Sequence, residues 1–381
     1  MYVVAHNGSA IFGGGELAVV RLLQGLQGRG HRVLLLCRDA IVAGRVEDFG
    51  VPAGVQRVGG DLALPDAFRL AGRLRHERPD VVLLTTFKKV LLAGLGARIA
   101  GVPRVVQRIG LESDTPARGR RYRWAYRNLV DDVVVNARSM RAPFLAAAPG
   151  LDPARVSVIP QGVVEPRRRC EPGALRRELG IPAGAPVFGA VARLARQKRL
   201  DRLIAALSHL PNEVHCVVAG AGEEEDALRA LAARSGVADR FHLAGHRDDV
   251  GDVLDALDAY VVCSDREGMC NAMLEAMAFG LPVVSTPVSG AEEALRPFID
   301  GTRPGRVVGF GEGELPAALR DLLADVDVRR AMGDAARRRA EASFGFDAMV
   351  LRWEALLGGT APAWDRPARR VAADAMAGIG V

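Results

Sequence analysis

The chain has 381 residues, of which 49% are hydrophobic and 25% are charged. This length exceeds what one compact core usually holds, so we expect two domains. No apolar run reaches the roughly 18 residues that a membrane span needs, because Arg98 and Arg104 interrupt the longest candidate, 90–106. The composition is that of a well-packed soluble protein and excludes a membrane-spanning one.

The cysteines and the first residues indicate a reducing compartment. The five cysteines are scattered and odd in number, and no two stand in a CxxC spacing. They are typical of reduced thiols rather than of a disulfide framework or a zinc site. The sequence opens on an apolar strand pattern at 2–5, without a basic leader segment, so we expect a cytoplasmic protein.

Charge is divided unevenly between the two halves. Residues 1–160 hold 23 Lys and Arg against 13 Asp and Glu, a net charge of +10. The remaining residues hold 28 against 32, a net charge of −4. The basic excess belongs to the first half.

Short apolar strands alternate with helical stretches, which predicts an α/β protein with parallel sheets covered by helices. In the first half, strands are predicted at 2–5, 32–37, 81–85, 104–107, 132–136 and 156–159, and helices at 16–28, 64–76, 89–100, 121–129 and 139–147. In the second half, strands are predicted at 187–191, 213–218, 241–243, 259–263 and 282–285, and helices at 200–207, 223–233, 250–254, 271–279 and 316–323.

Breaks in this pattern suggest the domain division. Residues 160–186 are rich in Pro, Gly and Arg, lack a period of their own, and form the predicted joint. We expect one domain at 1–162 and a second at 163–345. A further helix at 346–357 is expected to pack back on the first domain. A loose tail, 358–381, follows it, with a helical pattern at 371–376.

The most informative stretch runs from Cys263 to Glu293. An apolar strand ends at Ser264, a polar turn with Glu267 follows, and the next helix starts near 271 and contains Glu275. A strand-loop-helix unit presents free backbone N–H groups and the positive end of a helix dipole, where a phosphate can bind. Ionised carboxylates only accept hydrogen bonds, so the two acids suit sugar and ribose hydroxyls beside that phosphate.

This block resembles the donor site of the retaining GT-B glycosyltransferases of family GT4. Their pattern EG(F/M)xNxxLEAMAxGxPVV is matched position for position by the stretch EGMCNAMLEAMAFGLPVV, residues 267–284. The resemblance implies the GT-B fold, in which two Rossmann-like parallel-sheet domains face each other across a cleft. It also implies which residues bind the donor. Glu275 would hold the ribose and Glu267 the sugar, with Gly268, Met269, Asn271 and Leu274 completing the set.

A second match follows the strand predicted at 187–191. The sequence RLARQKRLD, 193–201, resembles the family segment R-L-x-x-x-K-G-x-D, whose Arg and Lys hold the donor diphosphate. Arg193 and Lys198 would neutralise charge that builds on the leaving group when no metal is present. With Glu267 they are the predicted catalytic residues. Arg199 stands where the family usually has Gly, and a solvated basic loop is the alternative interpretation.

Glycine turns form the remaining donor-side matches. Gly14 and Gly15, in GGGE at 13–16, resemble the family's GG-x-E start of the first helix, where backbone can approach a ligand. A plain flexible turn is the alternative. The same letters spell GxGxxA, but NAD binding requires the first glycine directly after the strand, whereas Gly13 is the eighth residue after Ala5. Gly220 and Gly222 resemble the family's GxG.

His246 lies in a turn that matches the family's G-x-x-x-D-V, where the nucleotide base usually rests. A surface turn residue is an equally good interpretation of this histidine. We include it among the predicted substrate-binding residues.

The first domain departs from the family pattern after its fourth strand. Many relatives carry a His there, whereas this chain reads VQRIG at 106–110. Arg108 could contact an anionic acceptor or the protein's own loops, and His6 is a substitute or a structural residue. The difference does not exclude sugar transfer, because the leaving phosphate can act as the base in a retaining mechanism.

Residues 117–128, ARGRRYRWAYRN, combine five arginines with three aromatic residues. Such a surface suits an anionic membrane face or a polyanionic acceptor. The alternative is a solvated Arg face with its aromatic residues in the core. No nucleic-acid-binding module surrounds the stretch, so nucleic acid is not an expected partner. The adjacent acids at 131–132 and 248–249 and the pair at 325 and 327 do not stand at nucleotide-facing positions, so no metal and no cofactor is expected.

These observations predict a GT4-like glycosyltransferase. It would move a sugar from a nucleotide-sugar to a glycan, lipid-linked or small-molecule acceptor on the first domain. A UDP-linked donor is expected only because such donors are the most frequent. Cell-envelope polysaccharide synthesis is the expected setting, with contact at the inner face of the membrane. Retention of configuration is implied by the family. A nucleotide-sugar epimerase or hydrolase of the same fold and a non-catalytic nucleotide-sugar-binding protein remain as alternatives.

Overall fold

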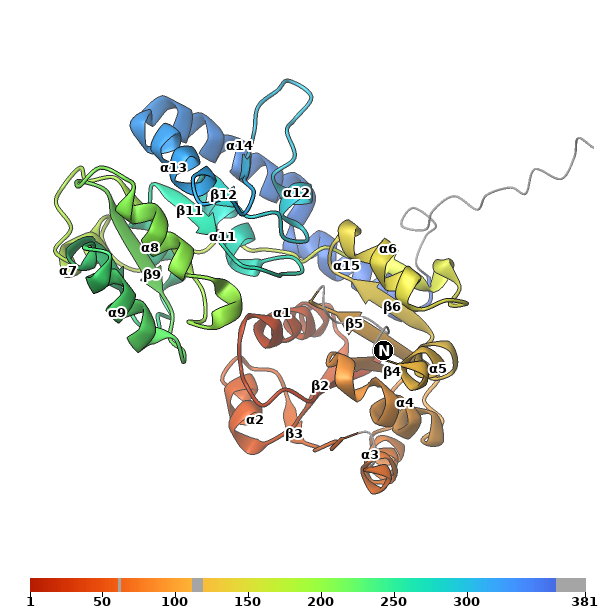
Figure 1. Ribbon diagram of the computed structural model, residues 1–381. Helices are drawn as coiled ribbons and strands as arrows, with labels where there is room; N and C mark the ends of the chain where they lie inside the picture. Colours follow the sequence, from red (N-terminus) through yellow and green to blue (C-terminus); the bar gives the residue numbers. More distant parts are fainter. Residues whose placement is uncertain (61–62, 112–118, 361–381) are drawn as a thin grey trace, which may run out of the picture.

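The computed structural model describes residues 1–60, 63–111 and 119–360, which form two lobes, each built on a parallel sheet (Figure 1). The first sheet has the strand order β3-β2-β1-β4-β5-β6-β7. Its strands are β1 (Tyr2–Asn7), β2 (Arg32–Cys37), β3 (Ala53–Val55), β4 (Val81–Leu84), β5 (Arg104–Ile109), β6 (Asp132–Val135) and β7 (Val156–Val158). Its helices are α1 (Gly14–Gly28), α2 (Ala40–Glu47), α3 (Leu64–Glu77), α4 (Val90–Ile99), α5 (Arg120–Asn128) and α6 (Arg138–Ala147).

The second sheet has the order β10-β9-β8-β11-β12-β13. Its strands are β8 (Val187–Val191), β9 (His215–Ala219), β10 (Phe241–Leu243), β11 (Ala259–Val262), β12 (Val283–Ser285) and β13 (Gly305–Val307). Its helices are α7 (Ala174–Glu178), α8 (Asp201–Ser208), α9 (Glu225–Arg234), α10 (Val250–Asp255), α11 (Asn271–Phe279), α12 (Ala291–Ala294), α13 (Glu314–Ala324) and α14 (Val326–Phe344). A last helix, α15 (Phe346–Leu357), follows α14.

The strands read as continuous apolar runs because helices cover both faces of each sheet. Every residue of the central strand β1 is buried. Its register aligns Val3 with Val33 of β2 on one side and with Val81 of β4 on the other. This explains why strand prediction succeeded for β1, β2, β4, β5, β8, β9 and β11, each of which carries four or more apolar or buried residues in a row. It succeeded as well for the shorter runs of β6, β7, β10 and β12.

Several elements were not predicted from the sequence. The strands β3 and β13 have three residues each, like the predicted β7, β10 and β12, but both contain a glycine and are partly exposed, so no apolar run marks them. The helices α7 and α12 have five and four residues, too few for a helical period to emerge. The predicted joint is therefore not free of structure, because α7 lies within it. The 19-residue helix α14 escaped prediction because small residues make up much of its buried side, among them Gly333, Ala335, Ala336 and Ala340. Such a stripe gives weak hydrophobic contrast.

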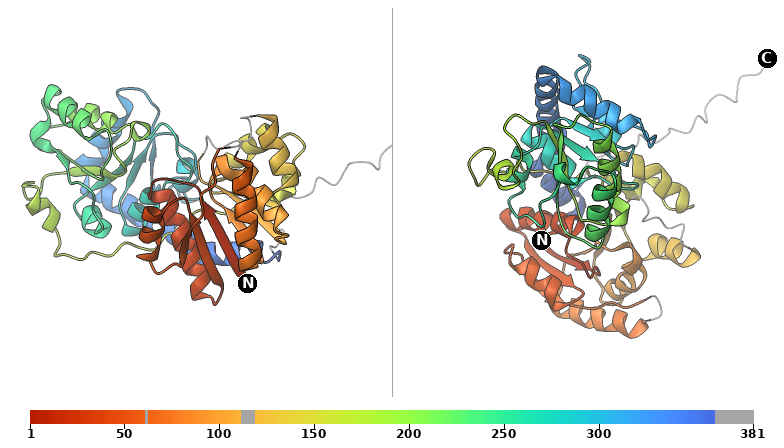
Figure 2. Two further views of the ribbon diagram at one scale, coloured as in Figure 1. Left: turned by 90° about the horizontal axis from the view of Figure 1, so that it is seen from below. Right: turned by 60° about the vertical axis from the view of Figure 1, so that its left-hand side comes forward.

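Helix α15 returns to the first lobe and packs against α1 (Figure 2). Its Trp353 is 2% exposed within the core that surrounds β1. Glu354 accepts hydrogen bonds from Arg29 and His31, both at 2.7 Å, and these bonds lower the pKa of its carboxyl group. The chain crosses between the lobes at two points that lie side by side, since Val163 bridges to Gly345.

Two observations bear on the remaining expectations. In residues 1–60, 63–111 and 119–360, none of the helices combines the length and apolar character that crossing a membrane requires. The helical pattern predicted at 371–376 lies outside the described residues.

The contact between α1 and α15 predicts opposite effects for two glycines of one helix. A Cβ at Gly25 would lie 2.4 Å from Val350 Cγ2, whereas a Cβ at Gly28 meets nothing within 4 Å. We expect Gly25→Ala to lower the free energy of unfolding by about 1–3 kcal/mol through overpacking. Gly28→Ala should be neutral or stabilising by up to about 1 kcal/mol, because alanine favours helix.

Urea denaturation of the two variants measures the difference. Equal midpoints for Gly25→Ala and Gly28→Ala would contradict the packing of α15 against α1.

Candidate functional site

The candidate site lies where the loops at the carboxyl ends of the two sheets meet. Each sheet has a point at which the strand order reverses, between β1 and β4 in the first and between β8 and β11 in the second. Loops leaving such neighbouring strands diverge and open a crevice, where α/β proteins bind ligands. Arg193 and Lys198 follow β8, and Glu267 follows β11. The predicted catalytic residues therefore come from the two strands that flank the reversal point.

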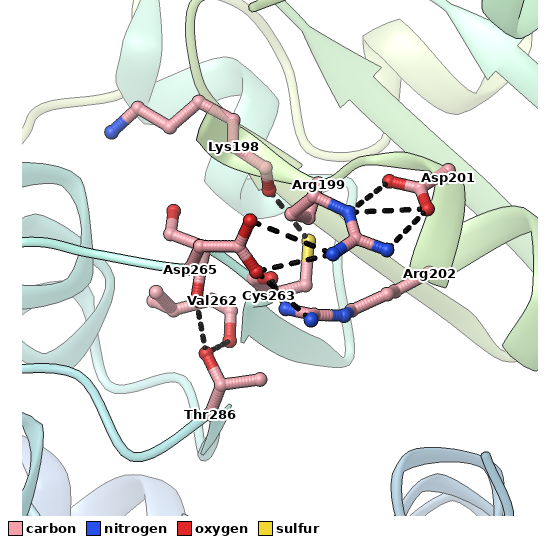
Figure 3. A network of polar contacts seen from close by, with 9 residues as sticks. Lys198, Arg199, Asp201, Arg202, Val262, Cys263, Asp265 and Thr286 are labelled. Carbon is pink, nitrogen blue, oxygen red and sulfur yellow. Dashed lines mark hydrogen bonds and ion pairs between the residues drawn. The ribbon is translucent and has the colours of Figure 1, made fainter. Parts of the chain in front are cut away.

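Hydrogen bonds and ion pairs link the loop after β8 to the loop after β11 (Figure 3). The amide of Asp265 donates to the carbonyl of Gln197 at 3.0 Å, and Gln197 Nε2 donates to the carbonyl of Arg266 at 2.7 Å. The Asp265 carboxylate forms ion pairs with Arg199 at 3.2 Å and Arg202 at 2.9 Å. These contacts fix the position of one loop relative to the other.

Lys198 points away from this cluster (Figure 3). Its Nζ lies 2.5 Å from Glu267 Oε1, which also accepts a hydrogen bond from Ser264 at 2.8 Å. Burial acts to lower the pKa of Lys198, but Cys270 and Glu267 outweigh it, and the pKa is raised above its usual value. Lys198 is therefore held as a cation, and Ser264 is a supporting residue that the sequence did not reveal.

Arg193 is the second cation of the crevice. Its side chain is exposed, and within the described residues it has neither a hydrogen-bond nor an ion-pair partner. It lies close enough to Lys198 for its charge to lower the pKa of that lysine. Two neighbouring cations, one of them unpaired, form a site suited to an anion with more than one charge.

Glu275 lies on α11 and is 7% exposed. Its Oε1 accepts a hydrogen bond from Arg21 Nη1 of α1 at 2.6 Å, a contact between the two lobes. Sequence reasoning missed Arg21, because its distance of 254 residues from Glu275 leaves no local pattern.

Cys270, at the start of α11, stays a thiol, since burial and Glu267 raise its pKa to about 11.

The loop of Gly268 packs tightly against the first lobe. A Cβ at Gly268 would lie 2.2 Å from the carbonyl oxygen of Gly110 and 2.6 Å from Asn136 Oδ1. Nearby, Asn271 Nδ2 donates to the carbonyl of Gly14 at 2.7 Å, which brings the predicted glycine turn to the start of α11. Glu293 accepts from the amide of Arg138 at 2.9 Å.

The structure gives the other predicted glycines different surroundings. A Cβ at Gly220 would lie 1.9 Å from the carbonyl of Ala192, and one at Gly222 would lie 2.3 Å from that of Leu194. These glycines let the turn after β9 pack directly on the loop that carries Arg193. Gly15 has open space around its Cβ position.

The remaining predicted residues divide between core and surface. Leu274 is 0% and Met269 5% exposed, and both belong to the core cluster beside the crevice. His246 is exposed and lies 3.4 Å from Asp248. His6 is 1% exposed on β1, and burial lowers its pKa to about 4, so it is neutral. Arg108, at the end of β5, is buried near Gly110.

Within the described residues, no group of three or more His, Cys, Asp or Glu side chains could hold a metal ion.

Arg199 shows why glycine is usual at its position. Its backbone has φ 50° and ψ 43°, the left-handed region that favours glycine. Here the side chain compensates through its ion pairs with Asp201 and Asp265.

Comparison with known proteins assigns the family. The pattern of the family Glycosyl transferases group 1 matches residues 173–339, and that of Glycosyltransferase Family 4 matches residues 12–165. Alpha-maltose-1-phosphate synthase of Mycolicibacterium smegmatis is 31% identical over 301 residues, which cover 71% of this chain and 76% of that protein. The chain belongs to the group 1 glycosyltransferase family.

A second relative and a solved structure extend this result. The lipopolysaccharide core biosynthesis glycosyltransferase LpsE of Rhizobium meliloti is 34% identical over 176 residues, 46% of this chain and 50% of LpsE. This chain thus spans about half the length of LpsE. Anabaena Alr3699/HepE, solved in complex with UDP, superposes with a TM-score of 0.82 at 21% identity, covering 94% of this chain and all of that one. This likeness confirms the predicted GT-B fold.

The left-handed conformation of Arg199 predicts a difference between two substitutions that remove the same ion pairs. Arg199→Gly relieves the backbone, whereas Arg199→Ala keeps the unfavourable φ. We expect the glycine variant to be more stable than the alanine variant by about 1 kcal/mol or more. Urea midpoints at equal slope measure this difference, and a more stable alanine variant would contradict it.

Proposed function

We propose that this protein is a glycosyltransferase that transfers a sugar from a nucleotide-sugar to an acceptor, with retention of anomeric configuration. The observation that carries the proposal is the convergence of Arg193, Lys198, Glu267 and Glu275 on the crevice between β8 and β11, facing the glycine turn of the first lobe. Membership of the group 1 family supports the same reaction.

Each residue has a role that its surroundings support. Lys198 and Arg193 bind the diphosphate and stabilise its charge as the bond from the sugar C1 breaks. Glu267 and the backbone of Gly268 and Met269 hold the sugar, and Glu275 accepts hydrogen bonds from the ribose hydroxyls.

In the reaction the C1–oxygen bond to the diphosphate breaks and a bond from C1 to the acceptor oxygen forms. The acceptor proton passes to the leaving phosphate. The contacts at Gly268 and Asn271 bring the lobes together over the reacting atoms and exclude water. No metal takes part in this proposal, because Lys198 and Arg193 supply the positive charge.

The comparisons guide the choice of substrates. HepE was solved with UDP and with UDP-glucose, which makes UDP the first nucleotide to test. LpsE is named for lipopolysaccharide core biosynthesis, which supports a glycan or lipid-linked acceptor in the cell envelope.

A membrane-facing role for α5 forms part of the proposal. Tyr122 and Tyr126 are buried, whereas Trp124 is 50% exposed. Trp124 lines a hollow of about 470 Å³ together with Arg120, Arg123, Arg127, Pro149 and Gly150. The aromatic residues thus split between core and surface. An indole surrounded by arginines suits the headgroup region of an anionic membrane. Of the predicted stretch, 117 and 118 lie outside the described residues.

The donor site is tested by calorimetry with UDP, GDP and ADP in the presence of EDTA. We expect one nucleotide to bind with micromolar affinity and Glu275→Ala to weaken it about tenfold or more, since hydrogen bonds to a charged group are lost. Glu292→Ala is the matched control, because Glu292 lies in the same block but is exposed.

Absence of binding by all three nucleotides would refute the donor site. Turnover separates the alternatives, since a transferase releases nucleotide only with acceptor, a hydrolase or epimerase consumes donor alone, and a binding protein does neither.

The membrane contact is tested by sedimentation with vesicles. We expect binding to phosphatidylglycerol-containing vesicles and not to pure phosphatidylcholine. Arg123→Gln should weaken binding about fivefold, the effect of one basic residue near an anionic surface. Trp124→Ala should also weaken binding, whereas Phe68→Ala, which removes another exposed aromatic residue of the first lobe, should not. Equal binding by all variants would argue against α5 as the contact.

A further inference from the structure

Arg108 is a buried cation that has no ion-pair partner within the described residues. Only 8% of its surface is exposed, at the carboxyl end of β5. Among the described residues its one hydrogen bond runs from Nη2 to Oε1 of Gln161, at 3.3 Å, and no carboxylate forms an ion pair with it. A guanidinium carries five N–H donors, so most of them lack a protein acceptor.

Such a group is costly to bury, because charges inside proteins are normally paired. Burial lowers the pKa of Arg108, and the charge of Glu16 offsets this only in part. Glu16 is already engaged, since its Oε2 accepts from the amide of Gly13 at 3.1 Å. Arg104, on the same strand, has a carboxylate partner, Asp132 at 2.6 Å, although its buried Nε lacks a hydrogen-bond partner.

The Arg108 guanidinium lies beside the contact between the lobes. A Cβ at Gly110 would lie 3.0 Å from Arg108 Nη1, so the charged group covers this glycine. The carbonyl of Gly110 in turn meets the backbone of Gly268, in the loop proposed to hold the sugar. Lys198 and Arg193, the cations proposed for the diphosphate, come from the second lobe.

We propose that Arg108 binds an anionic group, a phosphate or a carboxylate, carried by the transferred sugar or by the acceptor. This inference rests on the proposed function and names the charge of its substrate. A guanidinium offers paired donors that match the two oxygens of either group. The net charge of +10 on residues 1–160 favours the approach of an anionic substrate to this lobe.

Calorimetry on three variants tests the proposal. Arg108→Gln removes the charge and Arg108→Lys keeps it without the paired donors, while Arg104→Gln is the control on the same strand. UDP-glucuronic acid compared with UDP-glucose probes a charged donor sugar. Inorganic phosphate titrated into UDP-saturated protein probes a charged acceptor.

We expect one of two results for wild type: it binds UDP-glucuronic acid more tightly than UDP-glucose, or, when saturated with UDP, it binds inorganic phosphate. Arg108→Gln should weaken that probe about 10- to 100-fold, as expected for hydrogen bonds to a charged partner, and leave UDP within about threefold. Arg108→Lys should be intermediate, and Arg104→Gln should bind like wild type. The probe that is affected identifies the source of the anion.

The melting temperature without ligand distinguishes a ligand-binding role of Arg108 from a structural one, because the two roles predict changes of opposite sign. Arg108→Gln should raise the melting temperature by about 2–4 °C, because an unpaired buried charge is removed, whereas Arg104→Gln should lower it. A lower melting temperature for Arg108→Gln would make Arg108 structural.

Three binding results would overturn the inference: no preference of wild type for either charged probe, equal binding by Arg108→Gln, or an equal loss of UDP itself. In each case UDP binding by wild type leaves the proposed function standing. Failure of wild type to bind any nucleotide would instead refute the proposed function and the inference with it.

Discussion

The site depends on a backbone-to-backbone contact between the lobes. At Gly268 a Cβ would lie 2.2 Å from the carbonyl oxygen of Gly110, so only a residue without a side chain fits there. Because two main chains touch at this point, the loop after β11 and the end of β5 share one crevice. Glu267, which precedes Gly268, and Arg108, which lies beside Gly110, therefore flank this contact from the two lobes.

Around this contact the charged groups of the crevice hold one another in place. Lys198 is paired with Glu267, and Arg21 of the first lobe is paired with Glu275 of the second. Under the proposed function, an incoming diphosphate and ribose would exchange these partners for their own oxygens and hydroxyls. Such an exchange costs less than burying new charges, because the protein groups are already desolvated in part and oriented. Arg193 and Arg108 differ, since neither has an ion-pair partner within the described residues.

The loop that carries Lys198 illustrates how a departure from a family pattern is accommodated. Arg199 occupies a left-handed backbone conformation, and its guanidinium joins Asp201 of its own loop to Asp265 of the neighbouring one. Glycine would give the conformation without the cross-link. Arginine adopts this conformation at an energetic cost, but its ion pairs link the two loops that position Lys198 and Glu267.

The sequence by itself determined the alternation of strands and helices and the family, because local apolar runs and fixed spacings such as the one from Glu267 to Glu275 are properties of neighbouring residues. It also marked Arg193 and Lys198 as a pair of cations. The strand β13 and the Ala-rich α14 were missed, since a partly exposed strand with a glycine and a stripe of small side chains carry little hydrophobic signal. Only the tertiary structure placed Arg21 on Glu275 and buried Arg108 without an ion-pair partner in the described part of the chain. Those contacts join residues from different strands and lobes, and burial depends on what packs around a side chain, which no local spacing records.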